Sequence, residues 1–228
     1  MIPIRDTAPC ENRPYVTWSL MAICIALFVT LEIVPDKVHH YFVSLYGMVP
    51  ARYTDPNWAI AMGYPQDYFL SFVTNLFLHG GWGHLIVNMW FLWIFADNIE
   101  DRMGYGRFIL FYLLCGVAAT AIQWAYTPKL VFPVIGASGA IAGVLGAYFF
   151  LYPYAKIVLW VPLFFLPIFI EVPAIAFIGI WVIWQMQKAT TAMMFYGGAS
   201  NIALWAHLGG FVVGMLIFRF FLRKEYPE

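Results

Sequence analysis

One serine in this sequence stands where its hydroxyl could be reached by other groups. Ser138 is flanked by Gly136 and Ala137 on one side and by Gly139 and Ala140 on the other. Because these neighbours carry little side-chain bulk, a substrate or a catalytic partner could come close to the hydroxyl. Such a serine can serve as a nucleophile when a general base lies beside it. It can equally be an interfacial serine in a helix that packs through small residues.

Three other polar residues could complete a catalytic site around Ser138. His84 and Asn88 are four residues apart, so they share one face of a helix. His207 lies in the last apolar segment. With His207 as general base, His84, Asn88 and the backbone N–H of Ser138 become candidate donors to an oxyanion. The alternatives are an intramembrane histidine bonded to a neighbouring helix and a polar pair that joins two helices.

Glycines offer a physical means of bringing the two segments together. Gly139 and Gly143 follow Ser138 at helical spacing, and Gly210 and Gly214 lie on the same predicted helix face as His207. Small residues at such spacing allow close approach of helices in lipid. We therefore expect the serine segment and the histidine segment to pack against each other.

The composition indicates a membrane protein. Of the 228 residues, 63% are hydrophobic and 11% are charged, which is more apolar side chain than a soluble domain of this size buries. The net charge is zero and no basic run occurs, which argues against a nucleic-acid partner. The three cysteines are far apart and indicate neither a disulfide framework nor a zinc site. We expect no metal and no cofactor.

The apolar runs predict an all-α protein with six transmembrane helices. These runs cover roughly residues 17–34, 75–96, 107–126, 135–152, 171–187 and 201–222. The segment 153–170 is also apolar, but Pro162 and Pro167 interrupt it, so we predict an interfacial or re-entrant loop there. The predicted organisation is a cytoplasmic segment 1–16, a membrane domain 17–222 with a long first loop 35–74, and a cytoplasmic tail 223–228. The first span shows no small-residue cleavage site.

Lysine and arginine counts predict the orientation. With both termini in the cytoplasm, eight of these residues lie inside and four outside. The first residues of the second, fourth and sixth helices then lie at similar depth near the outer face, which allows Ser138, His207, His84 and Asn88 to meet. No acidic residue lies in the outer half of these helices, so a Ser–His dyad is predicted rather than a triad.

These residues occur in three motifs that resemble those of the rhomboid family of intramembrane serine proteases. The stretch Phe-Leu-His-Gly-Gly-Trp-Gly-His-Leu-Ile-Val-Asn-Met at 77–89 resembles its second-helix motif. Gly-Ala-Ser-Gly-Ala at 136–140 resembles its nucleophile motif, and Ala-His-Leu-Gly-Gly-Phe-Val-Val-Gly at 206–214 its base motif. Glu100, Gly104, Arg107 and Phe108 also resemble the family pattern. The match extends from about residue 70 to 218.

The resemblance implies a six-helix rhomboid fold with a water-accessible cavity open to the outside. It makes Ser138 the nucleophile and His207 the base, with His84, Asn88 and the Ser138 N–H as oxyanion donors. His79 matches a family histidine that we assign to loop support. Family substrates are single-span membrane proteins cut in or near the membrane, so the implied partners are such proteins and the lipid bilayer. We expect the bacterial plasma membrane as the location.

Three departures from the family pattern concern the surroundings of the dyad. The first loop lacks the usual Trp-Arg pair, which leaves open whether Trp58 or Arg52 substitutes for it. Ala142 stands four residues after Ser138, where many relatives have an aromatic residue against the histidine ring. Asp97 stands where glycine is frequent.

Other classes of function compete with proteolysis. A proteolytically inactive relative that binds membrane proteins and guides their trafficking is the main alternative, although it would not need both Ser138 and His207. A transporter is disfavoured because no inverted repeat is evident. A membrane metalloprotease is disfavoured because no His-Glu-x-x-His stretch occurs.

Overall fold

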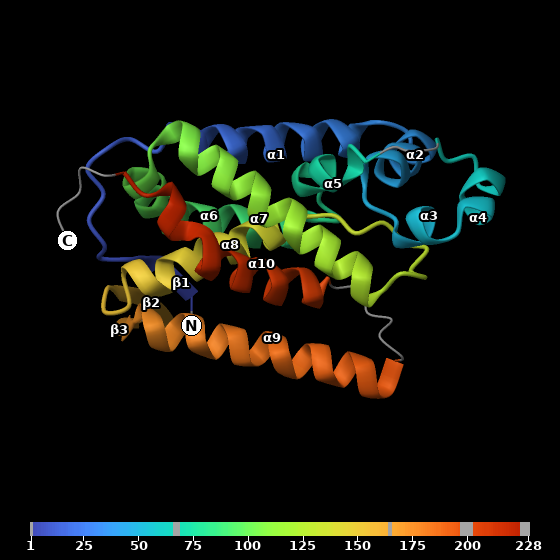
Figure 1. Cartoon of the computed structure of the whole chain (residues 1–228). Helices are drawn as coiled ribbons and strands as arrows, with labels where there is room; N and C mark the ends of the chain where they lie inside the picture. The colour runs from blue at the N-terminus through green and yellow to red at the C-terminus, as the bar shows by residue number, and fades with distance from the viewer. Residues whose placement is uncertain (1, 66–68, 164–165, 197–202, 224–228) are drawn as a thin grey trace.

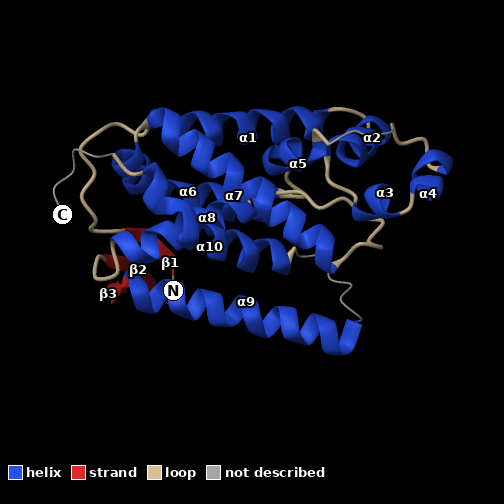
Figure 2. Ribbon diagram, in the orientation of Figure 1, coloured by secondary structure: helices blue, strands red, loops and turns tan. Residues whose placement is uncertain are grey.

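The computed structural model describes residues 2–65, 69–163, 166–196 and 203–223. Helices dominate it, and a small sheet lies at one end (Figures 1 and 2). The long helices are α1 (Tyr15–Ile33), α6 (Trp82–Met103), α7 (Tyr105–Tyr126), α8 (Ser138–Leu151), α9 (Ala174–Tyr196) and α10 (Leu204–Ile217). The short helices are α2 (Asp36–Tyr46), α3 (Pro50–Thr54), α4 (Pro56–Ala61), α5 (Ser71–Thr74), η1 (Asn75–Phe77) and η2 (Phe218–Phe221). The predicted tail lies outside the described residues except for Arg223.

Three of the described helices are long and apolar enough to cross a membrane. They cover Tyr15–Ile33, Tyr105–Tyr126 and Leu204–Phe221, and Ser138–Leu151 is a shorter apolar helix. The expectation of a mainly helical protein with membrane-spanning helices is therefore confirmed, the three-stranded sheet corrects the all-α prediction, and the predicted count of six spans stays a prediction. The helix predicted from residue 75 begins only at Trp82, because α5 and η1 form a separate turn before the glycines at 80 and 81.

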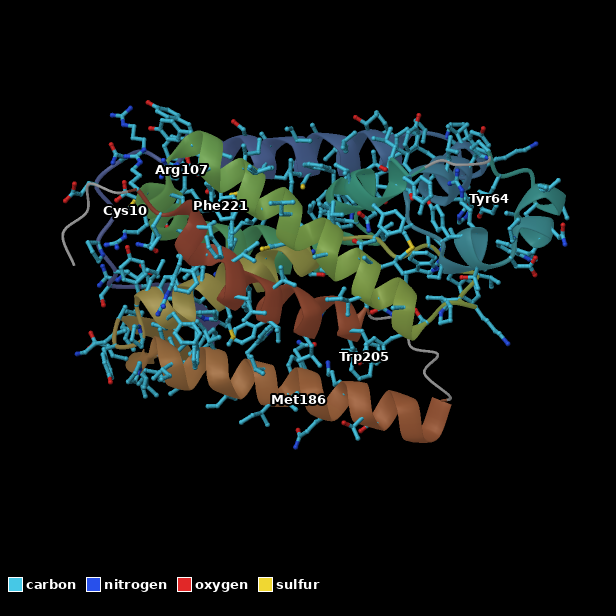
Figure 3. All side chains as sticks on the ribbon, in the orientation of Figure 1. Cys10, Tyr64, Arg107, Met186, Trp205 and Phe221 are labelled. Atoms are coloured by element: carbon cyan, nitrogen blue, oxygen red, sulfur yellow. The ribbon has the colours of Figure 1, made fainter. Side chains whose placement is uncertain are left out.

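The molecule has two distinct ends. The sheet lies at one end, and α2, α3 and α4 lie at the other (Figure 1). Cys10 and Arg107 mark the first end and Tyr64 marks the second (Figure 3). Since α8 runs from Ser138 toward the sheet, the serine lies on the side of the bundle that faces away from the sheet.

The first loop is held by a buried arginine. Arg52, in α3, is 5% exposed, and its guanidinium donates to the carbonyls of Leu45 at 3.3 Å and Pro65 at 2.9 Å. The same group lies 5.2 Å from the centre of the Tyr64 ring. The Trp58 ring also packs against the Tyr64 ring, with 5.7 Å between the ring centres. Of the two residues considered for the missing Trp-Arg pair, Arg52 is thus the one that ties the loop together.

The segment predicted as an interfacial or re-entrant loop forms a β-hairpin, and its position relative to the membrane stays a prediction. Strand β2 (Lys156–Leu163) pairs antiparallel with β3 (Leu166–Pro173), so the predicted start of the fifth helix at 171 is wrong by three residues. The N-terminal strand β1 (Ile2–Arg5) pairs antiparallel with β2 and completes a three-stranded sheet. Pairing with neighbouring strands satisfies the backbone N–H and C=O groups of this segment.

Two helices approach each other through glycines. A Cβ added to Gly210 or Gly214 of α10 would collide with the backbone of Gly139 or Gly143 of α8, respectively. Helix α10 packs mainly against α8 and α7. The small-residue faces of the serine helix and the histidine helix are therefore in direct contact, which places Ser138 and His207 on neighbouring helices.

Gly214→Ala should destabilise the protein because its methyl group would meet backbone rather than a flexible side chain. Overpacking of this kind costs about 1–3 kcal/mol. We expect a lower apparent Tm in detergent. Gly179→Ala in α9 is the matched control, since no heavy atom lies within 4 Å of its added Cβ. Equal melting of both variants would contradict the close packing of α8 and α10.

A buried glutamate fixes the start of α1. Glu100, 1% exposed, accepts hydrogen bonds from the backbone N–H groups of Val16 at 2.9 Å and Thr17 at 2.7 Å, and from the Thr17 hydroxyl at 2.7 Å. First-turn N–H groups have no partner within their own helix. Glu100→Ala should thus lower stability by about 2 kcal/mol or more. The measurement is thermal unfolding of Glu100→Ala, with Glu32→Ala, at an exposed position on α1, as the control. Equal Tm values of the two variants would show that Glu100 does not stabilise the start of α1.

Candidate active site

The site is built on the first turns of helices that begin at the same level. Ser138 is the first residue of α8, and His207 is the fourth residue of α10. The Nε2 atom of His207 lies 2.8 Å from the Ser138 Oγ atom. Both residues are partly exposed. A hydroxyl and an imidazole in this geometry can form a nucleophile with its general base.

A second histidine lies beside the serine. A Cβ added to Gly136 would lie 2.7 Å from the Cε1 and Nε2 atoms of His84 and 3.6 Å from Ser138 Oγ. Gly136 also has a φ of 128°, which side-chain-bearing residues rarely adopt. The Gly80 N–H donates to His84 Nδ1 at 3.5 Å. Because Nδ1 accepts this hydrogen bond, the single proton of the neutral imidazole is assigned to Nε2. His84 therefore presents an N–H toward the serine segment.

Asn88 and His79 complete the polar residues on this side. Asn88 lies one turn after His84 on α6 and is 5% exposed, and its Nδ2 atom has no hydrogen-bond partner among the described residues. A buried N–H without a partner is uncommon and calls for an explanation. His79 lies in the loop before α6 and is 2% exposed. Its ring meets the His84 ring edge-on at 5.2 Å.

Two residues of α9 at this site were not expected from the sequence. Gln185, 5% exposed, places its Oε1 atom 3.0 Å from His207 Nδ1. Trp181, one turn earlier, lies with its ring centre 6.2 Å from that of His207. Ala142, where many relatives have an aromatic residue, is fully buried, and the aromatic ring found near His207 is that of Trp181 instead. The one available signal was the spacing of Trp181 and Gln185, which puts both on one helix face.

Asp97 lies within α6, several residues before the helix ends at Met103. Its side chain accepts from the backbone N–H of Asn98 at 2.9 Å. The Asn98 side chain in turn donates to the carbonyls of Ala8 and Pro9, at 3.2 Å each. This part of α6 therefore contacts the N-terminal segment and is remote in sequence from the His84 end of the helix.

The fold and the site together define the class of protein: an apolar helical bundle with membrane-spanning helices, in which a serine and a histidine on two helices are hydrogen-bonded. Sequence comparison gives the family: residues 66–224 match the rhomboid domain. Because this match covers more than half of the chain, the chain belongs to the rhomboid family. The resemblance drawn from the three motifs is confirmed.

Individual relatives span several compartments. The chain is 33% identical over 159 residues to the mitochondrial Rhomboid protein 1 of Saccharomyces cerevisiae, covering 66% of this chain and 42% of the yeast protein. It is 31% identical over 137 residues to the rhomboid protease GluP of Bacillus subtilis, covering 60% and 24%. The chloroplastic Rhomboid-like protein 11 of Arabidopsis thaliana is 32% identical over 168 residues, covering 69% and 54%. The chain thus spans less than two thirds of each relative's length.

Proposed function

We propose that this protein is an intramembrane serine endopeptidase that cleaves the transmembrane segments of single-span membrane proteins near the outer membrane face. The observation that carries the proposal is the 2.8 Å contact between Ser138 Oγ and His207 Nε2. In this mechanism His207 removes the hydroxyl proton as Ser138 attacks the scissile carbonyl. The imidazolium then gives that proton to the leaving amine, and water hydrolyses the acyl-enzyme by the same route.

The length of α8 supports a site below the membrane surface. Its 14 residues rise by about 21 Å, less than the roughly 30 Å of a bilayer hydrocarbon core. A serine at the start of so short a helix lies within membrane depth when the other end reaches the opposite interface. We further propose that α1, α6, α7, α8, α9 and α10 form six membrane-crossing segments, with both termini in the cytoplasm.

The donors around Ser138 suit a developing negative charge. The Ser138 N–H begins α8, where helix N–H groups have no partner within the helix and the dipole is positive. We assign the His84 Nε2–H and the Asn88 Nδ2–H as further oxyanion donors. The buried Asn88 Nδ2 group has no partner among the described residues, as expected for a donor that bonds only to the oxyanion of the transition state. His79 would support the ring of His84.

The proposal is tested by labelling detergent-solubilised protein with a fluorophosphonate probe and locating the modified residue by mass spectrometry. Wild type should label at Ser138, and Ser138→Ala should not label. His207→Ala should also fail to label, because the serine is then not activated. Absence of labelling in correctly folded wild type, with an active rhomboid protease labelled in parallel, would favour a binding and trafficking protein without proteolytic activity.

The location of the protein remains a separate part of the proposal. The names of two relatives place them in mitochondria and chloroplasts, and a third comes from a bacterium. We propose the plasma membrane of a bacterial cell, with lipid and single-span proteins as partners. Membrane fractionation of the native host, with accessibility labelling of Cys10 from the cytoplasmic side, tests both the membrane and the orientation.

A further inference from the structure

The His207 ring contacts Ser138 through Nε2 and a different residue through Nδ1. A neutral imidazole carries one proton, and only the tautomer protonated at Nδ1 leaves Nε2 free to accept the serine proton. The Oε1 atom of Gln185 lies 3.0 Å from Nδ1 and can only accept a hydrogen bond. With this amide orientation the proton is held on Nδ1. The flipped amide would donate to Nδ1 and stabilise the unproductive tautomer.

No carboxylate takes this place among the residues that the structure describes. The ionisable groups whose charge reaches His207 are His84 on α6 and Lys188 on α9. When charged, both would repel an imidazolium. The carboxylates of Glu100 and Asp101 lie in the last turn of α6, at the opposite end from His84, where they accept hydrogen bonds from Val16, Thr17 and the N-terminal segment. The histidine therefore depends on a neutral amide for its orientation.

Helix α9 also supplies the ring that packs near the imidazole. Trp181 and Gln185 are four residues apart and contact the same histidine, one through its ring and one through its amide. The start of α9 is fixed because the Ala174 and Ile175 N–H groups donate to the carbonyls of Ala155 and Pro153. Gln185 is thereby held at a defined height along the bundle, where its buried side chain reaches the base.

We propose that Gln185 is a positioning residue that completes a Ser138–His207–Gln185 triad with an amide in the place of a carboxylate. This rests on the proposed function, in which Ser138 is the nucleophile and His207 the base. When the proton of Ser138 moves to Nε2, the Nδ1–H stays hydrogen-bonded to Gln185 Oε1. The amide orients the imidazolium through a dipole and contributes less than a carboxylate partner would.

The kinetic test compares Gln185→Leu, Gln185→Glu and wild type in cleavage of a reconstituted single-span substrate. Gln185→Leu should lower kcat by about 10- to 100-fold with KM unchanged, which corresponds to one lost buried hydrogen bond. Gln185→Glu should retain most of kcat, and the acid limb of its pH–rate profile should move to higher pH by about one unit, because a carboxylate stabilises the imidazolium. Gln187→Leu, on the exposed side of α9, is the matched control.

A second measurement does not depend on turnover. NMR of nitrogen-labelled histidine should show His207 protonated at Nδ1 in wild type and mixed tautomers in Gln185→Leu, with His207→Ala identifying the signals. Unchanged kcat, pH profile and tautomer in Gln185→Leu would overturn the positioning role and leave the protease proposal intact. Absence of both cleavage and probe labelling in wild type would overturn the protease proposal, and the NMR comparison would still decide the hydrogen bond. Should Gln185→Leu not fold, the shifted or unshifted acid limb of Gln185→Glu decides the role.

Discussion

Replacing Ser138 or His207 by alanine should each reduce cleavage by at least about 10⁴-fold, and the double variant should be no slower than either single variant. The reason is geometric: Oγ and Nε2 are 2.8 Å apart and exchange one proton, so either atom is useless without the other. The measurement is hydrolysis of a fluorogenic single-span substrate in liposomes.

Ser19→Ala and His40→Ala are suitable controls, because these exposed residues lie on α1 and α2. Their rates should equal that of wild type. If His207→Ala retained substantial activity, His207 would not be the base. If the losses of the two single variants multiplied in the double variant, the two residues would act independently and the dyad would be excluded.

Asn88→Ala should lower kcat by about 10² to 10³-fold while KM changes little. The buried Nδ2 group has no partner among the described residues, and a donor that bonds only to the oxyanion contributes to the transition state alone. The expected loss is smaller than for the dyad because His84 and the Ser138 N–H remain as donors.

The same liposome assay, run over a range of substrate concentrations, separates kcat from KM for this variant. Asn57→Ala in α4 is the control, since Asn57 is exposed. An unchanged kcat would show that Asn88 serves only helix packing. A raised KM with unchanged kcat would instead place Asn88 in substrate binding.

Local patterns in the sequence were sufficient to find the helices of the site and most of its polar groups. The long apolar runs located α1, α7, α8 and α10 to within a few residues. The spacing of His84 and Asn88 placed them on one face of α6, and the glycines at 139, 143, 210 and 214 indicated which helices touch. These features depend on residues close in sequence, so periodicity reveals them.

Features that depend on partners distant in sequence were missed. The prolines and the continuous apolar pattern of segment 153–170 did not reveal its hairpin, and its pairing with the N-terminal strand joins residues as distant in sequence as Ile2 and Trp160. Likewise, Asp101 accepts hydrogen bonds from the Glu11 and Asn12 N–H groups, about 90 positions away. No local propensity encodes such contacts, because the hydrogen-bonding groups of one segment are satisfied by another.

Local sequence patterns identified a helical membrane protein of the rhomboid family and singled out Ser138, His207, His84 and Asn88 as candidate groups for chemistry. The residue that faces the second nitrogen of His207, Gln185, emerges from helix packing alone. A search for acidic residues could not find Gln185, since a glutamine in an apolar helix becomes a candidate only when packing buries its amide against the imidazole. Residue types limit the possible chemistry, whereas the orientation of a base depends on which helix packs beside it.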